Sequence, residues 1–205
     1  YRSAVEKLYL PQKGNNGIIP QDDTFLSKKR IDIRKYKNNN IKQSILLDYS
    51  RSQVIDMQVL KQADVVMLLF TLRKLFDLET IKASWQYYEE QTIHDSSLSS
   101  AIHSITACYF RNFNKAYEFF SDACRIDMGQ NPASSDTGVH EAAMGGIWMA
   151  VVMGFGGVFN NEGQLEINPL LPEEWTRLSY GIYWQGRKIR IQVSNDKVVI
   201  NSPYQ

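Results

Sequence analysis

Apolar residues recur at helical spacing through most of the chain and alternate with polar residues toward its end. The stretch Val54–Phe76 is apolar on nearly every side, which predicts a helix buried among other helices. Further helices are predicted wherever apolar positions follow the spacing of one helical face. They are a helix capped by Asp77 with Glu79 in its first turn, one over Leu98–Tyr109, one that follows the cap Asn112, and one over Val139–Val152. Successive antiparallel helices of this kind favour a toroid of α-hairpins.

The periodicity changes at Gly154-Phe155-Gly156-Gly157, beyond which apolar and polar positions alternate. Alternation over short runs predicts β-strands, and the breaks between them carry the Asn, Asp and Gly residues of tight turns. The predicted strands, which we expect to form one antiparallel meander, lie around Leu165–Ile167, Leu178–Trp184, Ile189–Val193 and Val198–Ile200. The predicted fold class is therefore mainly α with a C-terminal β part. Residues 1–155 form the helical domain, with a long loop over 11–50, and residues 156–205 form the β domain.

Charge and composition exclude several classes of partner. The chain has 23 Lys and Arg residues against 22 Asp and Glu residues, a formal net charge of +1. Because this balance gives no general field for a polyanion, neither nucleic acid nor a membrane surface is an expected partner. The longest apolar stretch, Val65–Leu72, is far shorter than the ~20 residues that span a bilayer. No signal peptide opens the chain, so a cytoplasmic location is the default expectation.

The two cysteines, Cys108 and Cys124, have neither the number nor the spacing of a disulfide framework or a zinc site. We expect both to be buried free thiols. The first residues read like the last turns of a helix that Pro11 stops, and no initiator methionine precedes Tyr1. We therefore expect the chain to be a fragment of a longer polypeptide.

Polar residues interrupt the apolar pattern first at Lys61 and Gln62. An ammonium and an amide supply the hydrogen-bond donors that sugar hydroxyls require, so this pair is a candidate sugar contact. The alternative is structural: both side chains reach solvent at a helix end, or Lys61 pairs with Asp64.

Two more polar clusters stand at predicted helix starts. The segment His94–Ser99 gathers an imidazole, a carboxylate and three hydroxyls, and either Asp95 or Ser96 would serve as a helix cap. The segment Thr137–His140 and the pair Gly145-Gly146 repeat the theme, and a phosphate fits such a set of donors. The structural alternatives are capping, tight helix packing at the glycines, and a histidine buried in the core.

Other chemistries find less support. The histidines His94, His103 and His140 have no helical i, i+4 pair and no cysteine beside them, so a metal site is not predicted. No Gly-x-Ser-x-Gly motif indicates a nucleophilic serine. Paired carboxylates for glycoside hydrolysis could come from Asp22, Asp23, Glu89, Glu90, Asp95 and Glu141.

Several motifs, in order along the chain, resemble glycoside hydrolase family 65, the α-glucosyl disaccharide phosphorylases. They are Ile18-Ile19-Pro20-Gln21-Asp22, Lys61-Gln62-Ala63-Asp64, His94-Asp95-Ser96-Ser97-Leu98-Ser99, Gly154-Phe155-Gly156-Gly157, Asn168-Pro169 and Leu171-Pro172-Glu173-Glu174-Trp175. The resemblance implies a large N-terminal β-sandwich, a catalytic α/α toroid and a small C-terminal β domain. This chain would correspond to the second half of the toroid and that last domain.

The resemblance also implies an inverting reaction, in which an α-linked glucosyl disaccharide and phosphate give β-glucose 1-phosphate and a free sugar. Inorganic phosphate is then a co-substrate, and no organic cofactor is used. The disaccharide can be maltose, kojibiose, nigerose or trehalose, and the resemblance leaves a homodimer open. A family hydrolase and a non-catalytic carbohydrate-binding or assembly fragment are the alternatives.

By the same resemblance, residues of all three polar clusters have roles in the site. Those that line the glucosyl subsite are Lys61 and Gln62, and those around the phosphate are Ser96, Ser97, His140, Gly145 and Gly146. The family's general-acid glutamate belongs to an upstream motif that has no match in this chain. We therefore expect the chain to hold no catalytic proton donor, to need the missing N-terminal part of its polypeptide, and to be inactive alone.

Overall fold

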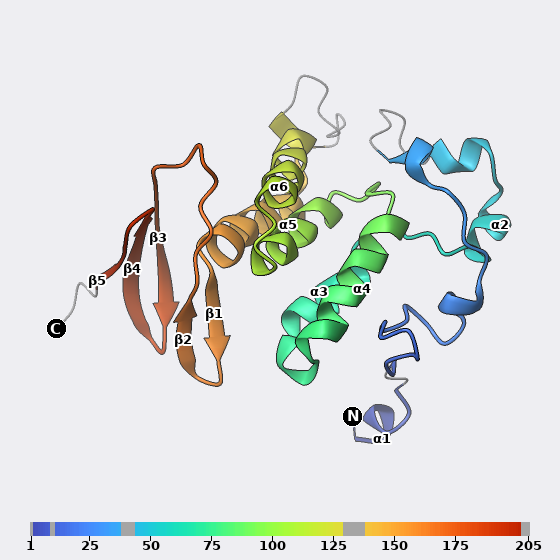
Figure 1. Ribbon diagram of the computed structural model, residues 1–205, viewed down its shortest axis with the longest axis horizontal. Helices are drawn as coiled ribbons and strands as arrows, with labels where there is room; N and C mark the ends of the chain where they lie inside the picture. Colours follow the sequence, from blue (N-terminus) through green and yellow to red (C-terminus); the bar gives the residue numbers. More distant parts are fainter. Residues whose placement is uncertain (1, 9–10, 38–43, 129–137, 202–205) are drawn as a thin grey trace. The chain divides into compact units, whose positions relative to one another are not determined.

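The computed structural model describes residues 2–8, 11–37, 44–128 and 138–201 (Figure 1). The chain divides into two compact units, Tyr1–Ser99 and Ser100–Gln205. In the described parts, the named elements are helices and turns up to Phe155 and antiparallel strands from Val158 onward, which confirms the mainly α class with a C-terminal β part. The toroid and the domain boundary at residue 155 stay predictions.

In the first unit, short 3-10 turns are interspersed among the α-helices. The elements are α1 (Arg2–Val5), η1 (Phe25–Ser27), η2 (Arg34–Tyr36), η3 (Ser44–Leu47), α2 (Arg51–Ile55), α3 (Asp64–Thr71), η4 (Arg73–Leu75) and α4 (Leu78–Gln91). Asp77 caps α4 as predicted, since its carboxylate accepts from the Thr80 N–H at 2.7 Å. The apolar stripe of α4, which includes Trp85 and Tyr88, is buried, and α4 packs against α3 (Figure 1).

The single helix predicted over Val54–Phe76 is wrong. Helix α2 ends at Ile55 and α3 begins at Asp64. The residues between them form two isolated parallel bridges, Lys29↔Met57 and Leu60↔Thr92. An apolar run that is buried on both sides has no periodicity that distinguishes a strand from a buried helix, so the sequence pattern was ambiguous at this point.

The predicted long loop contains only the short turns η1, η2 and η3 within its described parts, 11–37 and 44–50. Ile19 makes two of the hydrogen bonds that fasten it to α4: the Ile19 N–H donates to Ser84 Oγ at 3.1 Å, and the Tyr88 hydroxyl donates to the Ile19 carbonyl at 2.7 Å. A small apolar core, Ile33, Tyr36, Ile45 and Ile93, anchors the rest. These contacts explain how a segment with little regular structure is held against a helix.

The second unit starts with helices. They are α5 (Ser99–Tyr109), which begins at the boundary, α6 (Phe113–Met128), α7 (Glu141–Met149) and the π-helix η5 (Ala150–Phe155), which continues α7. Asn112 caps α6 as predicted, because its side-chain oxygen accepts from the Lys115 N–H at 3.3 Å. Helices α6 and α7 pack on each other. Among the described residues, no helix combines the length and the apolar character that a bilayer crossing requires.

The strands form two sheets, so the prediction of one meander of four strands is wrong. The strands are β1 (Val158–Asn161), β2 (Gln164–Ile167), β3 (Arg177–Trp184), β4 (Arg187–Ser194) and β5 (Val198–Asn201). One sheet has the order β1-β2 and the other the order β3-β4-β5 (Figure 1). The predicted turns are confirmed: Glu162-Gly163 and Gln185-Gly186 have positive φ at both residues, as a type I′ hairpin requires. The segment that separates the sheets contains Pro169 and Pro172, which cannot donate to a ladder.

Candidate functional site

Two of the predicted polar clusters start from adjacent backbone positions in the first unit. The Leu60 N–H donates to the Gln91 carbonyl at 2.9 Å, and the Ile93 N–H donates to the Leu60 carbonyl at 2.9 Å. The bridge that they form, Leu60↔Thr92, is parallel. Because the two bridged segments run in the same direction, Lys61-Gln62 follows one of them and the segment that starts at His94 follows the other. The sequence shows each cluster but not this pairing.

Lys61 and Gln62 lie just before α3 and not inside a helix, which corrects the expectation of a helical pair. The Gln62 side-chain amide donates to Asp64 at 2.9 Å, and the Gln21 amide donates to the other oxygen of Asp64 at 3.3 Å. Lys61 is exposed, and its Nζ has no hydrogen-bond partner among the residues described. The structural alternative of a Lys61–Asp64 pair is therefore not what the structure has. The Lys61 ammonium is thus left to donate to a ligand, and Asp64 orients the side-chain amide of Gln62.

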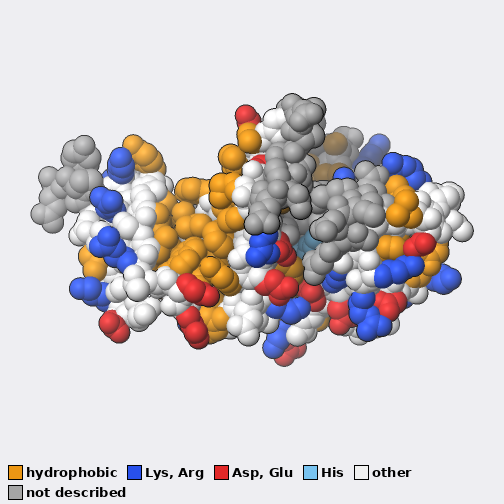
Figure 2. All heavy atoms as spheres, turned by 90° about the horizontal axis from the view of Figure 1, so that it is seen from above, with side chains coloured by type: hydrophobic (Ala, Val, Ile, Leu, Met, Phe, Trp, Pro, Cys, Tyr) orange, Lys and Arg blue, Asp and Glu red, His pale blue; other side chains and the backbone are white. Residues whose placement is uncertain are grey.

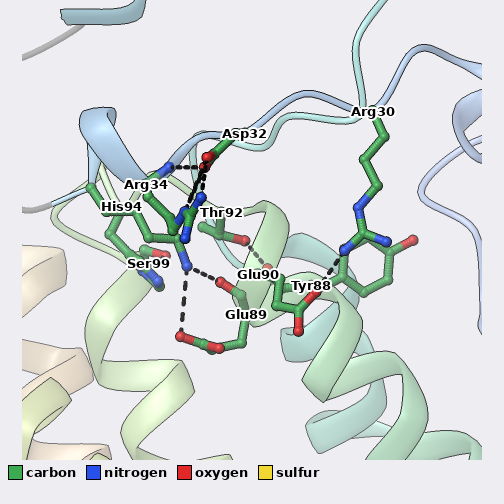
Figure 3. Close-up of polar contacts among 10 residues, drawn as sticks. Arg30, Asp32, Arg34, Tyr88, Glu89, Glu90, Thr92, His94 and Ser99 are labelled. Carbon is green, nitrogen blue, oxygen red and sulfur yellow. Dashed lines mark hydrogen bonds and ion pairs between the residues drawn. The ribbon is translucent and has the colours of Figure 1, made fainter.

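The segment before α5 adopts a strained turn. His94 has a φ of +56°, in the left-handed region, and its Nδ1 lies 2.8 Å from Ser99 Oγ (Figure 3). The Ser96 hydroxyl accepts from the Leu98 N–H at 3.3 Å and so closes a local turn before α5 begins at Ser99. Capping of α5 by Asp95 or Ser96 stays a prediction. The Ser97 hydroxyl, by contrast, makes no hydrogen bond with the described part of the chain. A local turn thus accounts for Ser96 and not for Ser97.

Near this turn, two carboxylates that the sequence offered as catalytic groups for glycoside hydrolysis are held in ion pairs (Figure 3). Glu90 pairs with Arg30 at 2.6 Å, and Glu89 pairs with Lys37 at 3.6 Å. Beside them, the Arg34 guanidinium donates to Asp32 and lowers the pKa of that carboxyl to about 2. A general acid needs a carboxyl that is available to the substrate, whereas Glu90 and Glu89 are each already in contact with a cation.

Asp22, another candidate carboxylate, is held in the same way. Burial alone would raise its pKa, but hydrogen bonds from Thr24 and Lys28 outweigh that effect and lower it. The Lys28 ammonium lies 3.1 Å from the carboxylate. A lowered pKa is the opposite of what a proton donor requires.

The second unit contains a histidine–carboxylate pair that the sequence did not predict. His140 is the residue before α7, and its backbone N–H donates to Asp127 Oδ2 at 2.9 Å. The His140 ring nitrogen Nδ1 lies 2.9 Å from the other oxygen, Asp127 Oδ1. The Asp127 side chain is only 7% exposed, whereas that of His140 is 37% exposed. Asp127 lies on α6, 13 residues before His140, so no local motif links them.

Gly145 and Gly146 lie inside α7, beyond its first turn. A Cβ at Gly146 would lie 3.0 Å from that of Ala101, which fits the tight-packing alternative, while a Cβ at Gly145 would meet nothing within 4 Å. The amides without intrahelical partners belong to the first turn, Glu141–Ala143. The phosphate role of both glycines stays a prediction, and Thr137 lies outside the described residues.

The remaining candidates have structural surroundings. His103 is buried, with its ring 5.2 Å from that of Phe119. Within the described ranges, no cluster of His, Cys, Asp and Glu could hold a metal ion. Cys108 is buried as expected, which raises the pKa of its thiol to about 12, while Cys124 is only half-buried. On the face shown in Figure 2, Lys and Arg side chains follow one another along the left edge, while cationic and anionic side chains mix over the rest.

Comparison with known proteins decides the family. The model of the glycosyl hydrolase family 65 central catalytic domain matches residues 1–149, and that of the family's C-terminal domain matches residues 160–204. The chain belongs to glycoside hydrolase family 65. Its similarity to the curated family 65 proteins extends over almost all of its length.

Among these relatives, a kojibiose phosphorylase of Escherichia coli (strain K12) is 43% identical over 97% of this chain. An α,α-trehalose phosphorylase of Thermoanaerobacter brockii is 38% identical over 97%. The chain spans 26% of the length of each. A solved structure, described as a putative kojibiose phosphorylase from human microbiome, superposes with a TM-score of 0.85 at 27% identity, over 98% of this chain and 28% of that one.

Proposed function

We propose that this family 65 chain supplies the glucosyl and phosphate contacts of an inverting disaccharide phosphorylase. The reaction takes an α-linked glucosyl disaccharide and inorganic phosphate to β-glucose 1-phosphate and a free sugar. The observation that carries the proposal is the parallel bridge Leu60↔Thr92. It starts the sugar-contact pair Lys61-Gln62 and the hydroxyl cluster of Ser96 and Ser97 from neighbouring backbone positions.

In this proposal Lys61 and Gln62 bind the hydroxyls of the glucosyl unit. The Lys61 ammonium has no internal partner among the residues described, and the bond from Gln62 to Asp64 fixes the direction of the amide. Donors that are held in place and not yet satisfied favour a polar ligand, because binding then replaces water without breaking a protein hydrogen bond.

The phosphate contacts in this proposal are Ser96, Ser97 and His140, with Gly145 and Gly146 as further predicted contacts. In an inverting glycosidase, one carboxylic acid protonates the leaving oxygen and a second carboxylate activates water. In a phosphorylase, phosphate itself is the nucleophile, so hydroxyls and an imidazole replace the second carboxylate.

We further propose that the general acid comes from outside these 205 residues and that the helices belong to a toroid. Two observations support the first point: Asp22, Glu89 and Glu90 are each ion-paired, and the chain spans 26% of the length of the phosphorylases it matches. A cytoplasmic location and a homodimer stay predictions.

Kojibiose is the first substrate to test. The relative at 43% identity is named a kojibiose phosphorylase, whereas a maltose phosphorylase of Bacillus subtilis (strain 168) is 28% identical. A nigerose phosphorylase of Lachnoclostridium phytofermentans is 31% identical. The panel therefore includes kojibiose, trehalose, nigerose and maltose.

The test measures release of glucose 1-phosphate from this panel, with and without phosphate, by the natural full-length polypeptide and by the 205-residue chain. We expect phosphate-dependent release by the longer protein only. Phosphate-independent glucose release would indicate a hydrolase, and sugar binding without cleavage would indicate a non-catalytic role. Activity of the short chain would show that the general acid lies within it.

A matched pair of variants tests the sugar contact. Lys61→Ala should raise the KM for the disaccharide and lower kcat, because the lost ammonium contact is made to the glucosyl unit. Lys82→Ala removes another exposed lysine, on α4, and should leave both constants unchanged. Equal kinetics for the two variants would exclude Lys61 from the site.

A further inference from the structure

We propose that Asp127 is a positioning residue of the phosphate subsite, which holds the His140 ring so that Nε2 is the nitrogen that contacts the anion. The inference rests on the proposed function and extends it to a residue of α6. Its basis is one buried carboxylate that binds the same residue twice, through Oδ2 to the backbone N–H and through Oδ1 to Nδ1, both at 2.9 Å.

The chemistry of the pair fixes the proton on the ring. An ionised carboxylate accepts hydrogen bonds and cannot donate them, so Nδ1 carries the hydrogen that points at Asp127. The ring nitrogen that remains for a ligand is Nε2, which has no hydrogen-bond partner among the described residues. In this tautomer Nε2 has a lone pair and no hydrogen, so it accepts from the O–H of monohydrogen phosphate. A second partner that sets both the tautomer and the orientation of a ligand-binding histidine is a common device in protein sites.

Burial argues that the pair is more than a helix cap. Capping α7 would require only the bond from the His140 N–H to Oδ2, and an exposed side chain can make that bond. Asp127 is instead 7% exposed, and a buried carboxylate is costly unless its oxygens are paired. The second bond, from Oδ1 to the ring, orients a histidine whose own side chain is 37% exposed and open to a ligand.

Asp127→Asn separates the two roles. Its amide oxygen can still accept from the His140 N–H and keep the cap, but its NH2 group now faces Nδ1 and requires that nitrogen to accept. The ring hydrogen then moves to Nε2, which can no longer accept from the O–H of monohydrogen phosphate and instead faces that O–H as a second donor. A purely structural Asp127 would tolerate this change, because the backbone bond is kept.

The experiment compares Asp127→Asn with Asp122→Asn in the natural full-length polypeptide. Asp122 is also on α6, and it pairs with Arg125 at 3.1 Å. For Asp127→Asn we expect the KM for phosphate to rise about tenfold or more, as for other residues that orient a ligating histidine. The KM for the disaccharide should change less than about twofold, and Asp122→Asn should match the wild type. In a His140→Ala background, Asp127→Asn should have no further effect.

Three results would overturn the inference: an unchanged KM for phosphate, an equal rise in both KM values, or an undiminished effect in the His140→Ala background. A measurement on the wild type keeps the test valid if the variant does not fold. In 15N spectra, the hydrogen should be on Nδ1 of His140, and inorganic phosphate should shift the Nε2 resonance. A hydrogen on Nε2, or no shift with phosphate, also overturns it. Failure of wild-type turnover with a phosphate shift retained would overturn only the proposed reaction.

Discussion

Gly157 is the position where a single methyl group should damage the second unit most. It has a φ of +65°, and a Cβ built there would lie 2.0 Å from the Asn168 carbonyl oxygen and 2.6 Å from the Pro169 nitrogen. Gly163 provides the matched control, because its φ is +86° and a Cβ there would meet nothing within 4 Å. Gly157→Ala and Gly163→Ala therefore share the backbone strain and differ in the steric overlap.

The magnitudes follow from these geometries. An L-residue in the left-handed region costs about 1–2 kcal/mol, which both variants incur. Only at Gly157 must the opposing backbone move, and overpacking of this kind costs about 1–3 kcal/mol. The movement also breaks the 2.9 Å bond from the Asn168 N–H to the Gly157 carbonyl, worth about 0.5–1.5 kcal/mol. Gly157→Ala should therefore lower the free energy of unfolding by about 1.5–4.5 kcal/mol more than Gly163→Ala.

The assay is equilibrium urea unfolding of both variants and the wild type, followed by tryptophan fluorescence, with the slope m compared as well as the midpoint. A lower midpoint at constant m reports stability alone. Equal losses of about 1–2 kcal/mol in the two variants would refute the steric reasoning and leave backbone strain as the only effect.

Three further predictions concern stability and reactivity. Hydrogen bonds from the amino terminus of α4 lower the pKa of Asp77 below its usual 3.8. The ionised carboxylate therefore adds to the free energy of unfolding above about pH 4, and this stabilisation is lost as the pH falls further. Acid unfolding of Asp77→Asn should depend less on pH than that of the wild type, and identical profiles would contradict this. Burial raises the pKa of the Cys108 thiol to about 12, so iodoacetamide at pH 8 should label Cys124 before Cys108. Mass spectrometry measures the two labelling rates, and faster labelling of Cys108 would show that this thiol is accessible. The buried Tyr180 hydroxyl donates to the Gly156 carbonyl at 2.9 Å, so Tyr180→Phe should cost about 1–3 kcal/mol in urea unfolding, and no change would mean that water replaces the bond.

Much of the local structure could be predicted from the sequence. Asp77 and Asn112 cap the helices that they were expected to cap, and Gln185-Gly186 forms a hairpin turn. Caps and turns are set by the conformational preferences of a few adjacent residues. The ordered motifs also indicated family 65, which the family models confirm.

The apolar run over Val54–Phe76 shows where local pattern is insufficient. It breaks into α2, a bridged segment and α3, because the backbone of its middle part pairs with Lys29 and Thr92. Both partners lie outside the run, so no window within it could show that extended backbone would gain these bonds. The division of the strands into two sheets has the same origin, since pairing between strands is a long-range property.

The candidate site divides in the same way. Side-chain chemistry made Lys61, Ser97 and His140 candidates from the sequence by itself. Only the tertiary structure decided that Leu60 pairs with Thr92, which starts two clusters from neighbouring positions, and that Asp127 binds His140 across 13 residues. The physical reason is that propensities, caps and turns depend on neighbours in sequence, whereas backbone bridges and hydrogen bonds between distant side chains depend on segments that only folding brings together.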